Sequence, residues 1–287
     1  MTTQTEGVLY LVGTPLGNMG DITFRAVETL KNADLIAAED TRQTRKLLSR
    51  FEIKKPLISY HEHNKQSRES EIIRRLHEGQ NIALVSDAGM PGISDPGSDL
   101  VKACIANGIE ISVIPGPAAL LTGLVASGIE TKEFVFGGFF PRQSKDRNNL
   151  LNELAAERRT MIFYESPHRL CATLQDMLSC WGEDRLCCVA RELTKVYEEY
   201  KRGTLQEVLK YYKEKGVKGE VTLIIEGYKK AEQKIELDQA VGILREKMKS
   251  GQEKKAAIKE IVVKYNLSRK ELYKSIIESE KNEKDTD

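Results

Sequence analysis

The chain contains 287 residues, of which 44 are Lys or Arg and 43 are Asp or Glu, so its formal net charge is +1. At about 150 residues per domain, this length favours two domains and leaves room for a small third one. Apolar residues make up 40% of the chain and charged residues 30%. These proportions are typical of globular proteins and exclude a collagen-like, a mucin-like or a wholly disordered chain.

The longest uncharged stretch, residues 111–129, is nearly long enough to span a membrane as a helix. Two prolines, Pro115 and Pro117, would break such a helix near its start, so the stretch predicts a strand, a turn and a buried helix. The N-terminal residues lack the features of a secretory signal, and the five Cys show no C-x-x-C spacing. We therefore expect a cytoplasmic protein without a membrane segment, with reduced thiols and without disulfides.

Short apolar runs alternate with helical patterns along most of the chain, which is typical of parallel βαβ units. Asp21, Asp40 and Asn64 are predicted to cap the starts of helices. The predicted strands are residues 8–12, 35–38, 57–59, 82–86, 111–114, 134–136, 160–164, 186–190 and 221–225.

The domain boundary is predicted at residues 115–117, because a strand ends there and the next helix begins a second α/β series. We predict one α/β domain at residues 1–116, a second at 117–228, and a C-terminal extension of three helical segments at 229–287. The extension contains 15 basic and 12 acidic residues, a net charge of +3.

The extension has the pattern of a helix-turn-helix. One helix presents an apolar face, and Ser268 with Glu271 matches a capping box at the start of the next helix. The apolar face is predicted from Ile258, Ile261, Val262 and Tyr265. Its basic residues either bind RNA or form a solvated surface, and composition does not decide between the two. They are Lys254, Lys255, Lys259, Arg269 and Lys270.

Loops at the carboxyl ends of strands carry the ligand sites of open α/β sheets. Residues 13–18 form a glycine-rich loop that matches neither the dinucleotide fingerprint nor a P-loop, so it is either a tight turn or part of a different ligand site. Residues 87–97 contain three Gly and two Pro, more than a strand-to-helix turn requires. We predict that Asp87 faces a ligand crevice, and the alternative is that it caps amides of its own loop.

Other segments give less specific signals. Residues 115–119 form either a flat wall beside an aromatic ring or an articulation between domains. Charged residues at 164–169, 191–195 and 218–220 form either a site or structural salt bridges. His61 and His63 have no third ligand nearby, so no metal site is predicted.

Six segments in order resemble the ribosomal RNA 2′-O-ribose methyltransferase branch of the tetrapyrrole methylase superfamily. They are LYLVGTPLGN followed by GDIT at residues 9–23, AEDTR at 38–42, SDAGMPGISDPG at 86–97, IPGP at 114–117, YESPHR at 164–169 and RELTK at 191–195. The resemblance covers residues 7–227, and the helical extension is also similar to that of the branch. Many tetrapyrrole enzymes have Gly-Asp-Pro in the main cofactor loop, where this chain has DAGMP.

The resemblance implies two α/β domains with a ligand cleft between them, S-adenosylmethionine as the cofactor, no metal, and a homodimer. It also implies methylation of a cytidine ribose in the decoding region of the small-subunit (16S) ribosomal RNA, within the assembled 30S subunit. The cofactor-binding residues that it implies are Pro15, Leu16, Gly17, Ser86, Asp87, Ala88, Gly89, Pro91, Gly92, Ile93, Ser94, Pro115, Gly116, Ala118, Thr122, Tyr164, Glu220 and Val221.

Methyl transfer from a sulfonium to a hydroxyl needs in-line geometry and removal of a proton. The carboxylates Glu165, Glu192 and Glu220 are candidate bases or orienting groups. The cations Arg169, Arg191 and Lys195 can hold RNA phosphate. We take Glu165, Arg191, Glu192 and Lys195 as the candidate catalytic residues and Arg169 as an RNA-binding residue.

Two alternatives remain at this point. One is a methyltransferase for a small tetrapyrrole, which would give no reason for a basic helical extension. The other is a non-catalytic RNA-binding assembly protein, which would not bind S-adenosylmethionine. The four Phe residues within 134–140 are further predicted to line the cleft or to meet a second subunit.

Overall fold

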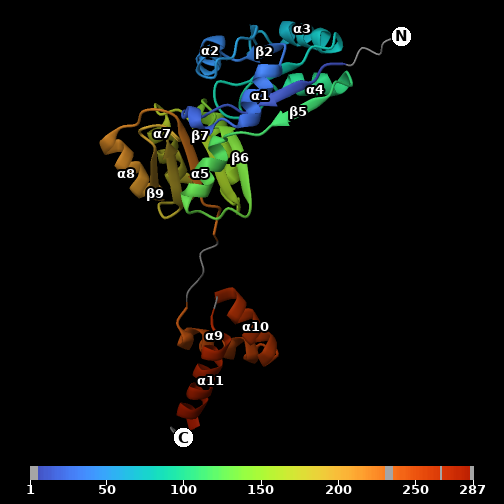
Figure 1. Ribbon diagram of the computed structural model, residues 1–287. Helices are drawn as coiled ribbons and strands as arrows, with labels where there is room; N and C mark the ends of the chain where they lie inside the picture. The colour runs from blue at the N-terminus through green and yellow to red at the C-terminus, as the bar shows by residue number, and fades with distance from the viewer. Residues whose placement is uncertain (1–5, 230–234, 266, 285–287) are drawn as a thin grey trace. The chain divides into compact units, whose positions relative to one another are not determined.

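The computed structural model describes residues 6–229, 235–265 and 267–284 (Figure 1). The chain divides into two compact units, Met1–Tyr228 and Lys229–Asp287. The first unit contains two five-stranded sheets, each covered by helices.

The first sheet is parallel throughout and has the strand order β3-β2-β4-β1-β5. Its strands lie where the sequence predicts them: β1 (Leu9–Val12), β2 (Leu35–Ala38), β3 (Leu57–Ser59), β4 (Ile82–Val85) and β5 (Ile111–Ile114). Its helices are α1 (Phe24–Asn32), α2 (Thr41–Arg50), α3 (Lys65–His77) and α4 (Ser98–Ala106).

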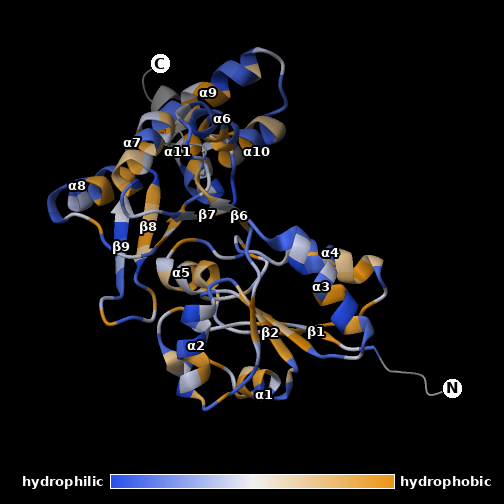
Figure 2. Cartoon of the chain, turned by 90° about the horizontal axis from the view of Figure 1, so that it is seen from above, coloured by the Kyte–Doolittle hydropathy of each residue, from blue (hydrophilic) through white to orange (hydrophobic). Residues whose placement is uncertain are grey.

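Helices cover both faces of this sheet, which explains why its central strands are continuously apolar. Ile82 and Leu84 of β4 pack with α3 and α4, whereas Ala83 and Val85 pack with α1 and α2. This alternation is the two-residue period of a strand. Figure 2 shows the apolar strands β1 and β2 enclosed by helices whose outer sides are hydrophilic.

The second sheet has the strand order β6-β7-β10-β8-β9. Its strands are β6 (Phe134–Phe139), β7 (Thr160–Glu165), β8 (Leu186–Arg191), β9 (Glu199–Thr204) and β10 (Val221–Ile225). Within it, β6 and β7 are parallel, whereas β10 pairs antiparallel with both β7 and β8, and β9 pairs antiparallel with β8. The expectation of parallel βαβ units along most of the chain therefore holds for the first sheet and for only part of the second.

The strand that the sequence pattern missed, β9, accounts for the difference. Its sequence EYKRGT contains no apolar run because it lies at the edge of the sheet, where half-exposed positions accept polar residues. The connection from β8 to β9 is a hairpin, so β9 runs opposite to β8. The following helix then connects β9 to β10, which runs in the same direction as β9. The helices therefore still connect strands of the same direction, but after the hairpin β9 and β10 run opposite to β7 and β8.

Helices also enclose the second sheet on both faces. Helix α5 (Ala119–Ser127) covers one face, and α6 (Ser144–Leu154), α7 (Leu170–Trp181) and α8 (Leu205–Lys215) cover the other. Residues 111–129 thus form a strand, a turn and a helix, as predicted. Within the described ranges, no helix is long and apolar enough to cross a bilayer.

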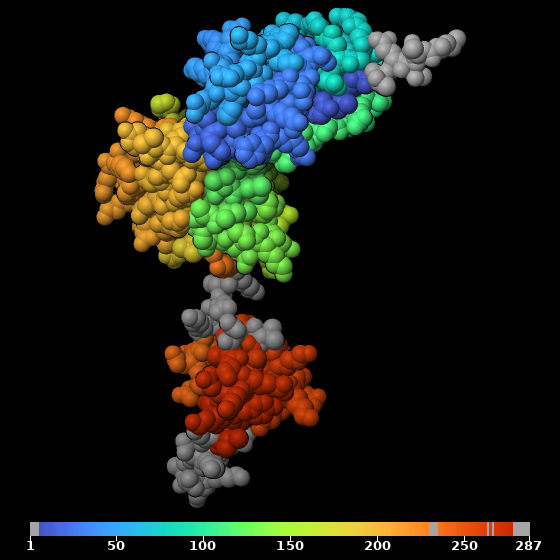
Figure 3. All heavy atoms as spheres, viewed as in Figure 1, coloured from blue at the N-terminus to red at the C-terminus, as the bar shows by residue number. Residues whose placement is uncertain are grey.

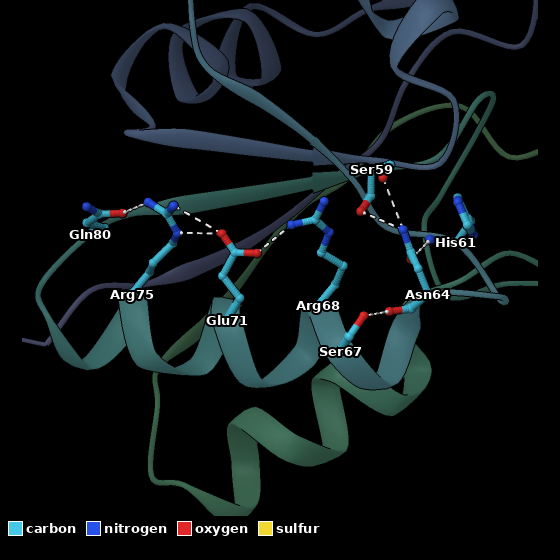
Figure 4. Close-up of polar contacts among 8 residues, drawn as sticks. All are labelled: Ser59, His61, Asn64, Ser67, Arg68, Glu71, Arg75 and Gln80. Atoms are coloured by element: carbon cyan, nitrogen blue, oxygen red, sulfur yellow. Dashed lines mark hydrogen bonds and ion pairs between the residues drawn. The ribbon is translucent and has the colours of Figure 1, made fainter.

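The predicted helix caps have different outcomes. Asp40 is the N-cap of α2, and its carboxylate accepts a hydrogen bond from Arg42 N at 2.8 Å. Asn64 precedes α3, but its side chain bonds to His61 N and Ser59 O instead of to the helix (Figure 4). The prediction for Asp21 is wrong, because Asp21 ends a short 3-10 helix and Thr23 caps α1.

The second unit consists, over its described residues, of α9 (Leu237–Lys249), α10 (Lys254–Tyr265) and α11 (Arg269–Lys284). Their apolar sides form one core, in which the predicted face of α10 is buried or half-buried. Ser268 Oγ accepts a hydrogen bond from Glu271 N, which confirms the predicted start of α11. Asn266, in the predicted turn, lies outside the described residues.

Candidate functional site

Two loops at the carboxyl edge of the first sheet are joined by their backbones. Thr14, after β1, and Gly89, after β4, form an isolated antiparallel bridge. Each backbone N–H donates to the carbonyl of the other residue, at 2.9 and 3.0 Å. Gly89 has φ +78°, a conformation that favours glycine. The glycines of these loops therefore shape a rigid site edge.

A third loop packs against the first without any intervening side chain. A Cβ on Gly13 would lie 2.8 Å from Gly116 Cα, and a Cβ on Gly116 would lie 2.9 Å from Gly13 Cα. Because β4, β1 and β5 are neighbours, their three loops meet at one place. The resemblance pointed to Gly116, and close backbone approach gives the physical reason for glycine there.

A cavity of about 540 Å³ opens at this edge and extends to the second sheet. The first sheet contributes the ends of β2 and β4, and the second contributes β6, β7 and β10. Its lining residues are Leu16, Glu39, Asp87, Ala88, Gly89, Met90, Ile93, Ser94, Asp95, Ala118, Ala119, Leu120, Leu121, Phe139, Tyr164, Glu165, Ser166, Leu193, Glu220, Val221 and Thr222.

Three carboxyl groups line one part of the cavity. Burial raises the pKa of Glu39, and the neighbouring Asp87 raises it further. Burial also raises the pKa of Asp87, and the hydrogen bond from the Asp40 backbone N–H offsets only part of this rise. The pKa of Asp95 is raised to about 7 by burial and by the negative charge of Glu39. Like charges held together in a half-buried site favour a positively charged ligand.

An apolar and aromatic wall belongs largely to the second sheet and α5. Tyr164 makes edge-to-face contacts with Phe136 and Phe139, with ring centroids 5.0 and 5.6 Å apart. Phe139 lines the cavity although 57% of it is exposed, which confirms that part of the Phe-rich segment faces the cleft. The cavity therefore combines an acidic wall with a surface suited to a flat ring.

Lys195 lies in a network at the cavity edge. Its Nζ is 2.9 Å from both Glu192 Oε1 and Glu220 Oε2, and Glu220 lines the cavity. Burial opposes the charge of Lys195, but these two carboxylates raise its pKa above the usual value. Lys195 is therefore a cation at neutral pH and not a proton acceptor.

The conformation around Glu192 is tightly constrained. Glu192 has φ +52°, and its Oε1 accepts a hydrogen bond from Glu220 N at 3.0 Å. A Cβ on Gly219 would lie 2.3 Å from the Glu192 carboxyl group. Unfavourable backbone conformations of this kind persist where the surrounding structure requires them, often at functional sites.

Glu165 is buried and its oxygens are already engaged. Oε1 accepts from Ser166 N and is paired with Arg169, both at 2.6 Å, and Oε2 accepts from Thr173 Oγ1 at 2.6 Å. Arg169 also donates to the carbonyl oxygen of Phe140. These contacts make Glu165 and Arg169 supports for the wall that carries Tyr164.

Many of the site residues predicted from the sequence line the cavity or lie in the loops around it. Those that line it are Leu16, Asp87, Ala88, Gly89, Ile93, Ser94, Ala118, Tyr164, Glu165, Glu220 and Val221. Others lie in the same loops or in α5 without lining it: Pro15, Gly17, Ser86, Pro91, Gly92, Pro115, Gly116 and Thr122. Arg191 is farther removed, because its guanidinium binds Glu199 and the carbonyl oxygen of Lys218.

Sequence reasoning missed several lining residues. Glu39 follows the apolar part of β2 at the same sheet edge as Asp87, so the strand-end rule that selected Asp87 could have found it. Asp95 stands within the predicted loop but carried no distinguishing signal. Leu121 and Leu193 line the cavity through folding of the second sheet and its helices, which sequence spacing does not reveal.

The predicted RNA-binding lysines and arginines belong to the second unit, apart from Arg169. Lys255, Lys259, Arg269 and Lys270 are exposed, whereas Lys254 is half-buried. Arg269 also lies over the Tyr273 ring, 5.8 Å from its centroid.

With this geometry established, comparison with known proteins identifies the family. A family model of the Tetrapyrrole (Corrin/Porphyrin) Methylases matches residues 8–209. The chain belongs to this family. The match ends before β10 and α9, so the helical unit lies outside it.

Three curated relatives of this chain share a single name. Each is named ribosomal RNA small subunit methyltransferase I. The protein from Synechocystis is 49% identical, and the alignment covers 96% of this chain and 99% of the relative. The protein from Halalkalibacterium halodurans is 56% identical (77% and 76% covered), and that from Bacillus subtilis is 48% identical (93% and 93% covered). The first and third alignments are long enough to include most of the helical unit.

Solved structures show the same fold at low identity. A diphthine synthase has a TM-score of 0.62 at 15% identity, covering 77% of this chain and 90% of its own. The uroporphyrin-III-C-methyltransferase of Thermus thermophilus has a TM-score of 0.57 at 17% identity, covering 77% and 94%. These similarities confirm the predicted class of fold.

Proposed function

We propose that this protein methylates the ribose 2′-oxygen of a cytidine in the decoding region of small-subunit ribosomal RNA, with S-adenosylmethionine as methyl donor. The name shared by its relatives supports ribosomal RNA as the substrate. The structural observation that supports the proposal is the cavity, whose acidic and aromatic walls fit a ligand with both positive charge and a flat ring.

The residues of the cavity fit this cofactor chemically. S-adenosylmethionine supplies an electrophilic methyl group on a positively charged sulfur. Glu39, Asp87 and Asp95 provide negative charge for its cationic groups, and Tyr164 with Phe139 provides a surface for its base. The joined loops around Gly89 hold the acidic wall in position.

The negative charges of the cavity wall also limit where RNA can bind. A phosphate close to Glu39 and Asp87 would be repelled, so we assign this part of the acidic wall to the cofactor. Lys195 is the cation next to the cavity edge, and its two carboxylate partners fix its position. We propose that Lys195 orients the RNA and that Glu192 acts as its positioning residue.

Removal of the hydroxyl proton needs an acceptor close to the reacting oxygen. Glu165 is a poor candidate because all its contacts are internal. Asp95 lines the cavity, and its pKa of about 7 matches a proton acceptor that works near neutral pH. We propose Asp95 for this role and Glu165 as a positioning residue.

The activity can be tested with methyl-labelled S-adenosylmethionine, using small subunits from a strain that lacks this protein and, in parallel, naked RNA. A 2′-O-methyl group blocks alkaline cleavage of the adjacent phosphodiester bond. We therefore expect the label in one alkali-resistant dinucleotide that contains cytidine. Label in an alkali-sensitive mononucleotide would indicate base methylation and contradict the ribose assignment.

A porphyrin-type acceptor in the same assay distinguishes the other activity that this fold permits. We expect no transfer to it. Transfer to the tetrapyrrole, with none to RNA or to subunits, would refute the proposed substrate while leaving the cofactor assignment in place.

A further inference from the structure

Helix α2 lies in the most basic segment of the first unit. Residues 41–55 contain six Lys or Arg and one Glu, a net charge of +5, in a chain whose net charge is +1. The 59-residue extension that the sequence singled out as basic carries only +3. The stronger concentration of positive charge therefore lies in the first unit, next to its first sheet.

The two sides of α2 differ in chemistry. Leu47 and Leu48 are buried, with Leu48 in the core against the first sheet, whereas Arg45, Lys46 and Arg50 are exposed. Among the residues that the structure describes, no ion pair involves these three side chains, and Lys46 bonds only to the neutral amide of Gln43. Figure 3 shows the segment with α1 and α2, coloured blue, at the outer surface of the first unit.

Helix α3, which follows α2 in the chain and covers the opposite face of the first sheet, has arginines that are paired. Its Arg68 and Arg75 both pair with Glu71 (Figure 4), and Arg74 pairs with Glu78. The arginines of α3 are neutralised by Glu71 within the helix and by Glu78 at its C-cap. Helix α2 contains no acidic residue, and only its Arg42 pairs with a carboxylate, that of the N-cap Asp40, so the charges of Arg45, Lys46 and Arg50 remain available to an external anion.

The basic residues of α2 are arranged as a row. Arg42, Lys46 and Arg50 are each four residues apart and lie on one side of the helix, about 6 Å apart along its axis. A regular row of cations suits the repeating phosphates of a nucleic-acid strand better than a single compact anion. Arginine is also the side chain that best matches phosphate geometry.

The row begins at the edge of the cavity. Asp40, the N-cap of α2, donates its backbone N–H to Asp87 Oδ1 at 3.0 Å, and Asp87 lines the cavity. Arg42 is held here through its bidentate pair with the Asp40 carboxylate. These contacts fix the first turn of α2 beside the cavity, and Arg45, Lys46 and Arg50 follow farther along the helix.

We propose that the exposed face of α2, formed by Arg45, Lys46 and Arg50, binds the phosphate backbone of the substrate RNA next to the methylated nucleotide. This inference rests on the proposed function, because that function supplies RNA as the partner. It adds a binding surface on the first unit to the one expected on the helical extension.

The test compares two triple variants with equal charge loss: R45Q/K46Q/R50Q on α2 and R68Q/R74Q/R75Q on α3. Binding to small subunits is measured between 50 and 200 mM salt, and methylation kinetics are measured on the same subunits. Each lost phosphate contact should reduce the salt dependence of log K by about 0.7 to 0.9. We expect the α2 variant to lose a slope of about 2 and at least roughly tenfold affinity, with KM raised more than kcat is lowered.

The α3 variant is expected to bind with nearly the wild-type slope, because its arginines are already paired. Calorimetric titration with S-adenosylmethionine should give unchanged affinity for both variants, which shows that the fold and the cavity are intact. Equal slopes and equal KM for the α2 variant and wild type would overturn the inference. Equal losses in both variants would also overturn it, since they would report net charge and not a binding surface.

Failure of the proposed function is distinguishable from failure of this inference. Wild-type protein that binds subunits but transfers no methyl group would refute the proposed function, while the salt slopes would still report on α2. Wild-type protein that binds neither subunits nor RNA would refute both.

Discussion

The carboxylate of Asp87 accepts a hydrogen bond from the backbone N–H of Asp40, with 3.0 Å between Oδ1 and N. The same side chain faces the cavity at the end of β4. Asp40 caps α2 and pairs with Arg42, which holds the pKa of Asp40 at about 2. One carboxylate thus contributes both to the acidic wall and to the position of the first turn of α2.

These two contributions can be separated by substitution. Asp87→Asn keeps an oxygen that accepts the Asp40 N–H but removes the charge, whereas Asp87→Ala removes both. We expect both variants to bind S-adenosylmethionine about tenfold or more weakly. Only Asp87→Ala should also lose about 1 kcal/mol of stability, which lowers Tm by about 2–4 °C. Calorimetric titration and thermal melting check the two effects, and unchanged affinity in Asp87→Asn would contradict the charge role.

The raised pKa of Asp95 predicts how stability changes with pH. Its usual value of 3.8 is raised to about 7 in the folded protein. The folded state therefore binds this proton more tightly than the unfolded state. This contribution to stability is fully present below about pH 4 and is lost as the pH rises through 7. We expect Asp95→Asn to have a higher Tm than wild type at pH 8 and a smaller difference in Tm at pH 5.

Cofactor affinity should change with pH in the opposite direction. A cationic ligand prefers the ionised form of Asp95, so wild-type affinity for S-adenosylmethionine should rise on the order of tenfold between pH 5.5 and 8. In Asp95→Asn this rise should be smaller, and methylation should fall at least about a hundredfold if Asp95 accepts the proton. An Asp95→Asn variant with a wild-type pH–rate profile would exclude that role.

The role of Glu192 and Lys195 is testable through a neighbouring glycine. In Gly219→Ala the new Cβ would collide with the Glu192 carboxyl group, and the backbone φ of +84° adds strain. Gly216→Ala provides a matched control, because its φ is +76° but a Cβ there would enter open space, with nothing within 4 Å. Both variants should lose about 1 kcal/mol of stability. Only Gly219→Ala should lose methylation, by at least roughly tenfold, while cofactor affinity is retained.

Much of this architecture follows from local patterns in the sequence. The strands of the first sheet are short apolar runs such as residues 82–85, and their direction follows from the helices between them. The second sheet was harder to predict, because β9 is polar and has no apolar run. Its pairing with β8 is also not visible in a local sequence pattern. A single unrecognised edge strand was enough to hide the antiparallel position of β10.

The functional site was also only partly predictable from the sequence. Asp87 and the glycine-rich loops were predictable because strand ends in α/β sheets carry ligand sites. The contact between Gly13 and Gly116, and the buried contacts of Glu165 with Arg169 and Thr173, depend on packing between segments far apart in the chain. Sequence reasoning could select Glu165 as a charged residue at a strand end, but only the structure shows that its oxygens are already occupied.

Glu165 is accordingly expected to affect stability more than chemistry. Removal of the Glu165 carboxylate leaves the buried Thr173 hydroxyl without its acceptor and Arg169, whose side chain is 25% exposed, without its ion-pair partner, at a cost of about 2–3 kcal/mol. Glu165 is only 3% exposed, so Glu165→Ala should lower Tm by about 6 °C or more. At temperatures where the variant remains folded, its affinity for S-adenosylmethionine should be within about threefold of wild type. Normal melting combined with complete loss of methylation would instead make Glu165 a catalytic residue.

Deletion of residues 231–287 separates the cavity from the helical extension. The deleted segment contains 13 basic and 12 acidic residues, so the deletion removes a net charge of only +1. All the residues that line the cavity, and all of α2, belong to the first compact unit, so we expect the truncated protein to fold and to bind S-adenosylmethionine normally. Methylation of assembled subunits should fall steeply, because we expect the exposed Lys255, Lys259, Arg269 and Lys270 of the extension to bind RNA. The residual binding should keep the part of the salt dependence that R45Q/K46Q/R50Q removes, since that part belongs to α2. Equal activity of the truncated and full-length proteins on subunits would show that the lysine-rich surface of the extension is only solvated, and α2 would then carry the larger share of RNA binding.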